Sequence, residues 1–196
     1  NEIKKDKRVY RLSESTLGLL GFGRIGKRIS EKAMSFGMNV IAYDPFLKQS
    51  DVSGVKLLDL NNVLAESDFI SLHLPLNDQT NHIIDDKQLE LMKQNSILIN
   101  VSRGGLINEN ALIKYLSSGK LRGAGLDVIE GSIEKSNKLF SFDNVIITPH
   151  TAFFSQESSE ELQLRSSQQL YDVLEGFKPK FLINPDVLNN SKVMLK

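Results

Sequence analysis

Three glycines near the start of the chain have the spacing of a phosphate-binding loop. Gly21, Gly23 and Gly26 form the pattern G-x-G-x-x-G between an apolar run and a helix-like segment, and this context distinguishes a binding loop from ordinary glycine turns. Gly21 would permit a tight turn, Gly23 would let the backbone approach a pyrophosphate, and Gly26 would let the helix and strand pack closely. The N–H groups at the helix start would then bind the phosphate charge.

Asp44 ends the next apolar run, about 20 residues beyond the loop, where the dinucleotide-binding pattern has an acidic residue. A carboxylate there accepts hydrogen bonds from a ribose diol and repels a 2′-phosphate. The pattern therefore favours NAD over NADP, although Lys48 is close enough to keep NADP open. A glycine turn beside a loop aspartate has the same spacing without any ligand, and so does a site for a nucleotide sugar or a methyl donor.

Three further polar residues follow strand-like runs, where ligands bind in open α/β sheets. Arg103 follows SILINVS, Asp127 lies in GLDVIEGS shortly before Glu130, and His150 ends NVIITPH. Arginine offers a bidentate fork to a carboxylate, and histidine transfers protons near neutral pH. With a nicotinamide, these groups suit hydride transfer to or from a 2-hydroxy acid. Each also has an ordinary structural interpretation, as a surface residue at a helix start or as a turn residue.

The two other histidines are predicted to have no chemical role. His73 is expected to line the wall of a cofactor site, and His82 is expected to be solvated. No group of His, Asp and Glu has the spacing of metal ligands, and no serine-nucleophile motif is present. We therefore predict no metal site.

The elements that would position these residues alternate along nearly the whole chain. The apolar runs predict strands over Thr16–Gly21, Met38–Asp44, 55–58, Asp68–Leu74, Ser96–Ser102, Gly123–Ile129 and Asn144–His150. Helical periodicity predicts helices over Arg24–Phe36, Asn61–Glu66, Asp85–Lys93, Asn108–Lys120 and Ser155–Leu174. Strands alternating with helices indicate βαβ units, and continuous apolar strands indicate a sheet covered on both faces. The predicted fold class is α/β, a doubly wound parallel sheet of the Rossmann type.

Composition excludes several classes of protein. The 196 residues carry 24 Lys+Arg and 24 Asp+Glu, so the basic surplus of a nucleic-acid-binding protein is missing. No apolar run reaches the roughly 18 residues of a membrane span, and we predict no membrane association. The chain has no cysteine, which excludes disulfides and thiolate metal sites and fits a reducing compartment. We predict a cytoplasmic location.

Several longer motifs, taken together, carry a family resemblance. GLLGFGRIGKRI, SLHLPLNDQTNHII, INVSRGGLINENAL, GAGLDV and NVIITPHTAF occur in one order, and this order resembles the NAD-binding domain of the D-isomer-specific 2-hydroxyacid dehydrogenases. That family includes D-lactate, glycerate and phosphoglycerate dehydrogenases. The resemblance covers roughly Thr16 to Asp186. It implies an oxidoreductase that uses NAD on a small 2-hydroxy or 2-keto acid, and a homodimer formed through the cofactor domain.

Two alternative functions stay open. The family also contains the C-terminal-binding-protein corepressors, toward which TPHTAFFS leans, and these imply a non-catalytic NAD-sensing scaffold. A nucleotide-binding domain with unrelated chemistry is the other alternative. The placement of Arg103 and His150 argues against both.

The resemblance also implies roles for individual residues. Arg103 would bind the substrate's carboxylate and carbonyl, and His150 would exchange the hydroxyl proton. The residues implied in cofactor binding are Gly21, Phe22, Gly23, Arg24, Ile25, Gly26, Asp44, Leu74, Pro75, Leu76, Thr80, Val101, Ser102, Arg103, Asp127, His150 and Ala152.

One position departs from the family pattern. The family pairs its histidine with a glutamate five residues after the aspartate, where this chain has Ser132. A paired carboxylate raises the pKa of histidine by about one unit or more, which serine cannot do. Either Glu130 or Glu134 substitutes for it, with Glu130 the candidate we name, or His150 is a weaker base and turnover is poorer.

The extent of the chain is the second departure. The family binds its acid between this domain and a substrate domain built mainly from preceding residues, and little precedes Thr16. We expect residues 1–15 to be a linker or hinge remnant and residues 16–176 to be the dinucleotide-binding domain. Residues 177–196 would be an extended tail belonging to a substrate domain that is largely absent. Such a chain would bind NAD without turning over substrate.

Overall fold

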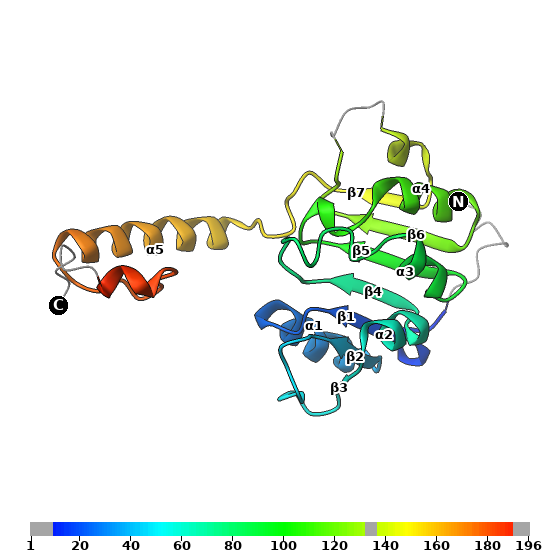
Figure 1. The fold of residues 1–196 in the computed structure, drawn as a ribbon, viewed down its shortest axis with the longest axis horizontal. Helices are drawn as coiled ribbons and strands as arrows, with labels where there is room; N and C mark the ends of the chain where they lie inside the picture. The colour runs from blue at the N-terminus through cyan, green and yellow to red at the C-terminus, as the bar shows by residue number, and fades with distance from the viewer. Residues whose placement is uncertain (1–9, 132–136, 190–196) are drawn as a thin grey trace. The chain divides into compact units, whose positions relative to one another are not determined.

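The computed structural model describes residues 10–131 and 137–189. Contacts divide the chain into two compact units, Asn1–Ala152 and Phe153–Lys196, and each is described by itself. The first unit holds a seven-stranded sheet in which all strand pairs are parallel, in the order β3-β2-β1-β4-β5-β6-β7 (Figure 1). The chain winds outward from β1 to β3 and then returns to place β4 beside β1, so the sheet has its topological switch point between these two strands. This is the doubly wound parallel sheet predicted from the sequence.

The elements have the following bounds. The strands are β1 (Thr16–Leu20), β2 (Asn39–Tyr43), β3 (Lys56–Leu57), β4 (Phe69–Leu72), β5 (Ser96–Asn100), β6 (Leu121–Leu126) and β7 (Val145–Ile147). The helices are α1 (Arg24–Ser35), α2 (Leu60–Glu66), α3 (Asp86–Leu91), α4 (Glu109–Ser117) and α5 (Gln156–Leu174), with short 3-10 helices over Leu12–Glu14, Gly104–Leu106, Lys138–Ser141 and Pro185–Asn189.

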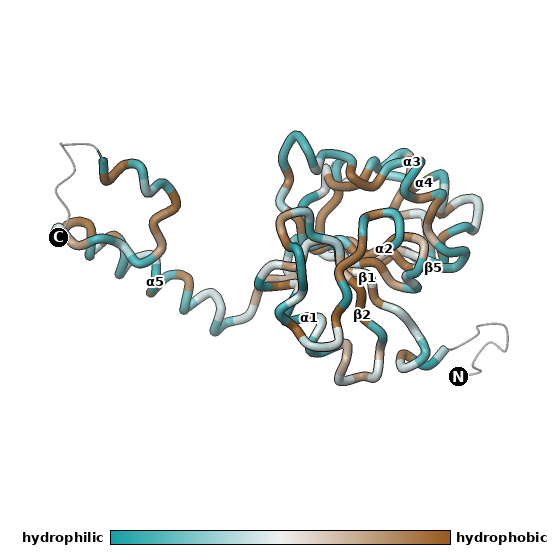
Figure 2. The backbone as a smooth tube through the Cα atoms, turned by 60° about the horizontal axis from the view of Figure 1, so that its bottom comes forward, coloured by the Kyte–Doolittle hydropathy of each residue, from teal (hydrophilic) through white to brown (hydrophobic). Residues whose placement is uncertain are grey.

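Alternating side chains of the sheet supply two separate cores. Leu17 and Leu19 of β1 share one core with Ala33 of α1, whereas Leu20 belongs to the other core with Leu64 of α2. Helices α3 and α4 also contribute to the second core. Because successive strand residues point to opposite faces, α1 covers one face of the sheet and α2, α3 and α4 cover the other. Figure 2 shows β1 and β2 as apolar segments running through the middle of this unit.

Two helices have recognisable capping residues at their ends. The side chain of Asn108 accepts a hydrogen bond from the Ala111 N–H at the start of α4, and Gly119 after its end has φ +72°. Gly37 follows α1 with φ +79°. Glycine takes this left-handed conformation at little cost, which ends a helix.

Most strands are shorter than predicted, and the difference lies mainly at their carboxyl ends. Asp44, Leu74, Ser102 and Ile129 were all placed within predicted strands, yet each lies beyond the last residue of its strand. The extra residues form the carboxyl edge of the sheet.

The second unit begins at Phe153 by contacts. Its helix α5 buries none of its side chains, and the predicted domain bounds stay a prediction. The tail is not wholly extended, since Pro185–Asn189 form a 3-10 helix. In the predicted linker, Leu12–Glu14 form another, and residues 1–9 lie outside the described part. None of the helices in the described ranges combines the length and apolarity needed to cross a bilayer.

Candidate functional site

The glycine loop has the geometry that its three glycines predict. Gly21 has φ +95°, and a side chain there would place its Cβ 2.6 Å from the carbonyl oxygen of His73. A Cβ at Gly26 would lie 2.4 Å from the carbonyl oxygen of Gly21, so the helix and the turn approach too closely for any other residue. A Cβ at Gly23 would meet nothing within 4 Å. Gly23 therefore borders open space, which is what a phosphate approaching the backbone requires.

The start of α1 leaves backbone donors for an anion. The helix begins at Arg24 with Gly23 as its N-cap, and no side chain caps it. The first N–H groups of a helix have no partner within the helix and carry the positive end of its dipole. Arg24 and Ile25 in this turn are exposed. The open space at Gly23 and these donors fit the pyrophosphate of a dinucleotide.

Asp44 lies directly beside this loop. Its Oδ2 accepts the N–H of Phe22 at 3.0 Å, and its Oδ1 accepts the N–H of Phe46 at 3.0 Å. These bonds fix the carboxylate, and each oxygen keeps a further lone pair that can accept a ribose hydroxyl. The sequence predicts Phe22 as a cofactor contact, but its ring is fully buried and its N–H is used by Asp44. Phe22 therefore holds the loop in place from within the core.

An open cleft of about 530 Å³ lies next to the loop, within the range of about 300–1,000 Å³ typical of ligand sites. It is bordered by the first turn of α1 and by the segments that follow β4 and β5, at the carboxyl edge of the sheet. Its lining residues are Ile25, His73, Leu74, Pro75, Leu76, Val101, Ser102 and Arg103. The cleft thus brings together seven residues predicted for cofactor binding and His73, which is predicted to line the wall.

Thr80 and His73 have structural roles beside the cleft. The Thr80 hydroxyl donates to the carbonyl of Pro75 at 2.6 Å, so Thr80 braces the loop after β4 and does not line the cleft. Nε2 of His73 lies 2.9 Å from Oγ of Ser71. Burial lowers the pKa of His73 to about 4, so its ring is neutral at neutral pH and adds no charge to the cleft.

A buried amide shapes the turn that presents Arg103. Nδ2 of Asn100 donates to the Arg103 carbonyl at 2.8 Å, and its Oδ1 accepts the Ser102 N–H at 3.0 Å. The Ser102 hydroxyl donates to the carbonyl of Leu72 at 2.7 Å, which ties this turn to β4. The Arg103 side chain is exposed, and its Nη1 donates to the carbonyl of Ser102 at 2.6 Å. Asn100 was not singled out in the sequence, although a polar residue ending an apolar run was a usable signal.

Asp127 organises the turn that carries His150. Its Oδ1 accepts the Thr148 hydroxyl at 2.5 Å and the Thr151 N–H at 2.8 Å, and its Oδ2 accepts the Ala152 N–H at 2.9 Å. Burial raises the pKa of this carboxyl, but these hydrogen bonds and the charge of His150 outweigh it and hold the pKa below its ordinary value. Asp127 is therefore a fixed anion that anchors the turn.

His150 and Arg103 come from strands that are next-but-one neighbours in the sheet. Asn100 of β5 is paired with Leu126 of β6, which is paired with Ile147 of β7. Arg103 and His150 each follow these paired ends by three residues. Because adjacent strands lie about 4.8 Å apart, the two strand ends are roughly 10 Å apart. His150 has φ +55°, a tight-turn conformation that the Asp127 bonds support.

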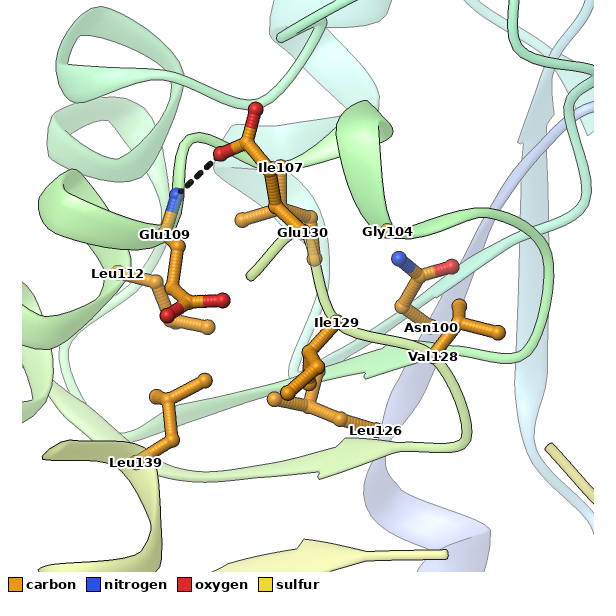
Figure 3. Close-up of a pocket in the computed structure, with 10 residues that line it drawn as sticks. All are labelled: Asn100, Gly104, Ile107, Glu109, Leu112, Leu126, Val128, Ile129, Glu130 and Leu139. Atoms are coloured by element: carbon orange, nitrogen blue, oxygen red, sulfur yellow. Dashed lines mark hydrogen bonds between the residues drawn. The ribbon is translucent and has the colours of Figure 1, made fainter. Parts of the chain in front are cut away.

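Glu130 has a different partner from the one predicted. Its carboxylate binds Nε2 of His82 through one oxygen and the N–H of Glu109 through the other, at 3.3 Å (Figure 3). Glu130 was named as one candidate partner of His150, and the structure pairs it with His82. The side chain of His82, predicted to be solvated, is only 34% exposed. After β6 the chain lies against Gly104, 2.0 Å from a Cβ built there, and this directs Glu130 toward α4. Ser132 and Glu134 lie outside the described residues.

With this geometry established, the chain can be compared with known proteins. The family model for "D-isomer specific 2-hydroxyacid dehydrogenase, NAD binding domain" matches residues 2–152, more than half of the chain. The chain belongs to this family. The matched range ends at Ala152, where the first compact unit also ends.

Curated relatives and solved structures of this dehydrogenase family agree. The glyoxylate reductase of Thermococcus litoralis is 42% identical over 184 residues, 93% of this chain and 56% of that protein. The hydroxypyruvate reductase of Thermotoga maritima is 41% identical, over 87% of this chain and 56% of that protein. D-lactate dehydrogenase from Aquifex aeolicus, solved with NAD and lactic acid, has a TM-score of 0.81 at 35% identity, covering 86% of this chain and 56% of that one. This chain therefore spans about half the length of the relatives it matches.

Proposed function

We propose that this chain is the cofactor domain of an NAD-dependent dehydrogenase that transfers a hydride between NAD and a small 2-hydroxy or 2-keto acid. The observation that carries this proposal is the single sheet edge that holds the glycine loop, Asp44, Arg103 and His150. The loop and Asp44 fit a dinucleotide, while a guanidinium and an imidazole fit an acid with a hydroxyl or carbonyl beside its carboxylate. The named relatives, two reductases of 2-keto acids, support the same substrate class.

Each proposed residue has a defined task. When bound, NAD supplies the hydride acceptor, and NADH the donor. Gly23 and the first turn of α1 hold the pyrophosphate, and Asp44 holds the adenosine ribose. Arg103 binds the substrate's carboxylate and polarises its carbonyl. His150 removes the hydroxyl proton during oxidation and returns it during reduction.

The partner of His150 affects how fast this reaction proceeds. Glu130 is already bound to His82 and Glu109, and Ser132 has no carboxylate to stabilise an imidazolium. Glu134 is the remaining candidate named from the sequence. Without such a carboxylate, we expect turnover to be slower than in relatives that have one.

The full-length protein containing this chain tests the function directly. We expect it to oxidise NADH when given glyoxylate, hydroxypyruvate or pyruvate, followed by the loss of NADH absorbance. Tight binding of NADH with no turnover across this panel would contradict the enzymatic part of the proposal. The reductases and dehydrogenases found as relatives offer no support for the corepressor-like scaffold, and we do not propose it.

Assembly and location are also proposals. We infer a homodimer formed through this domain, from the family resemblance, and a cytoplasmic location, since the chain has no cysteine to form disulfides. Sedimentation of the full-length protein at several concentrations checks the first, and a monomer at all of them contradicts it. Fractionation of the source cells checks the second.

Replacing Gly23 by alanine should weaken NADH binding without unfolding the protein. The new methyl group enters space where no protein atom lies within 4 Å, so the melting temperature should change little. The same methyl group would occupy the space of the pyrophosphate, and we expect the dissociation constant for NADH to rise by about 30-fold, roughly 2 kcal/mol. Calorimetric titration measures this. Gly26→Ala is the matched contrast, because its methyl group would meet the Gly21 carbonyl at 2.4 Å and should lower the melting temperature.

Replacing Asp44 by asparagine should reduce the preference for NAD over NADP. The change keeps the size of the side chain but removes the negative charge that favours the ribose diol and repels a 2′-phosphate. The amide also has one acceptor oxygen in place of two, so it keeps only one of the bonds to the Phe22 and Phe46 N–H groups. Since hydrogen bonds to charged groups contribute about 1.5–3 kcal/mol, we expect NADH affinity to fall by about tenfold or more, while NADPH affinity rises. Fluorescence titrations with both cofactors measure the ratio. Lys48→Gln is the control, because it should weaken NADPH alone, and an unchanged ratio in Asp44→Asn would contradict the assignment.

A further inference from the structure

Two consecutive glycines follow Arg103, and other segments hold them from two sides. Gly104 lies so close to the chain after β6 that a Cβ there would be 2.0 Å from the carbonyl oxygen of Ile129 and 2.6 Å from the nitrogen of Glu130. On the other side, the carbonyl of Gly105 accepts the N–H of His82 at 2.8 Å. Gly104 and Gly105 therefore lie between residue 82 and residues 129–130.

The side chains of these flanking segments meet each other. Nε2 of His82 binds Oε1 of Glu130, and both side chains are only about one-third exposed (34% and 36%). The second oxygen of Glu130 accepts the N–H of Glu109, the first residue of α4, as Figure 3 shows. The pair thus joins the two segments that flank Gly104 and Gly105. Glu130 is also bonded to the start of α4, where the positive end of the helix dipole favours a carboxylate.

The chain on both sides of this pair is also fixed. Ile84 forms an isolated parallel bridge with Ile107, in which its N–H donates to the Leu106 carbonyl at 3.0 Å and its carbonyl accepts the Asn108 N–H at 2.9 Å. The Glu109 carboxylate accepts the N–H of Gly131 at 3.1 Å. Within this turn, Gly104–Leu106 form a 3-10 helix in which the Gly104 carbonyl accepts the Ile107 N–H at 3.1 Å. The His82–Glu130 pair adds a side-chain contact between the two segments that flank Gly104 and Gly105.

We propose that His82 and Glu130 form a clip that holds Gly104 and Gly105 and thereby positions Arg103 for its acid. Glycine loses more conformational freedom on ordering than any other residue. Without contacts around Gly104 and Gly105, the position of the Arg103 guanidinium would therefore be poorly defined. Neither His82 nor Glu130 lines the cleft, so both are positioning residues. This inference rests on the proposed function of Arg103. A catalytic group displaced by about 1 Å can lower the rate by about 100-fold.

The test uses alanine variants of both residues in the full-length protein. We expect Glu130→Ala and His82→Ala to raise the KM for the 2-keto acid by about tenfold, while the dissociation constant for NADH stays within about twofold. Glu130→Gln keeps an acceptor for the Glu109 N–H and should recover most of the loss. Asp86→Ala is the matched control, since it breaks another carboxylate pair, with Lys114, away from the Arg103 turn, and should change neither constant.

Hydrogen exchange gives a second measurement that needs no activity. Amides of residues 103–107 should exchange faster in both alanine variants than in the parent and in Asp86→Ala, with exchange in β1 unchanged. Unchanged exchange over 103–107 in both variants overturns the clip, and so does an equal loss of NADH affinity and thermal stability, which indicates general unfolding. If the parent protein turns over no 2-keto acid, the proposed function fails, and the exchange result alone then decides whether the clip exists.

Discussion

Replacement of Arg103 by glutamine is expected to lower kcat/KM for the 2-keto acid by about 10³-fold, roughly 4 kcal/mol. A guanidinium binds a carboxylate through two parallel hydrogen bonds and stabilises charge that develops on the carbonyl oxygen, whereas an amide offers one weaker donor. The side chain is exposed, with one contact to the Ser102 carbonyl, so the fold should survive. Steady-state kinetics on the full-length variant, beside a titration with NADH, makes the measurement.

Arg103→Lys is the matched control for charge. Lysine keeps the positive charge but not the planar fork, so it should recover only part of the rate. NADH affinity should fall far less than kcat/KM in either variant, because Arg103 is only one of the residues that line the cleft. A glutamine variant whose kcat/KM stays within about fivefold of the parent would show that Arg103 does not bind the substrate.

Replacement of His150 by asparagine is expected to lower kcat by about 10²–10⁴-fold, the usual contribution of a general acid–base group. Asparagine is the right substitute because His150 has φ +55°, a left-handed conformation that asparagine adopts more readily than most residues. The Asp127 hydrogen bonds that support this turn come from Thr148, Thr151 and Ala152 and are retained. Rates measured from pH 5 to 9 on both proteins test the role, with ~0.5-unit steps to resolve the titration.

The pH profile separates chemistry from structure. If His150 transfers the proton, its titration disappears from the profile of the variant, and NADH binding persists. A variant that keeps both the rate and the pH dependence of the parent would contradict the assignment of His150 as the acid–base group. His150→Ala is the contrast, because alanine tolerates the left-handed turn less well and should also lower the melting temperature.

The predicted sheet and its binding loop depended on local signals. The apolar runs and helical periodicities of this chain can be read within a few residues, and they identified seven strands and five helices in the structure. The glycine spacing was equally local, and Gly21 and Gly26 have the close backbone approaches expected of them. The order of the longer motifs indicated the family, and the family model that matches residues 2–152 confirms it.

Errors in the site came from contacts between distant parts of the chain. Glu130 and His82 are 48 residues apart, and no spacing rule links them. The sequence alone therefore left Glu130 as one of two candidate partners of His150 and left His82 in solvent. Asn100 was missed for a different reason, because its contacts with Ser102 and Arg103 are local and depend on the conformation of the turn.

The sequence alone determined the fold class, the phosphate-binding loop and the polar residues at the strand ends. It could do so because periodicity and turn chemistry depend on short stretches of chain. The tertiary structure decided which of those polar residues meet. It joined Glu130 to His82 and Asp127 to the turn of His150, because a carboxylate takes the donors that packing brings within about 3 Å. Those donors lie in turns that are far from their acceptors in the sequence.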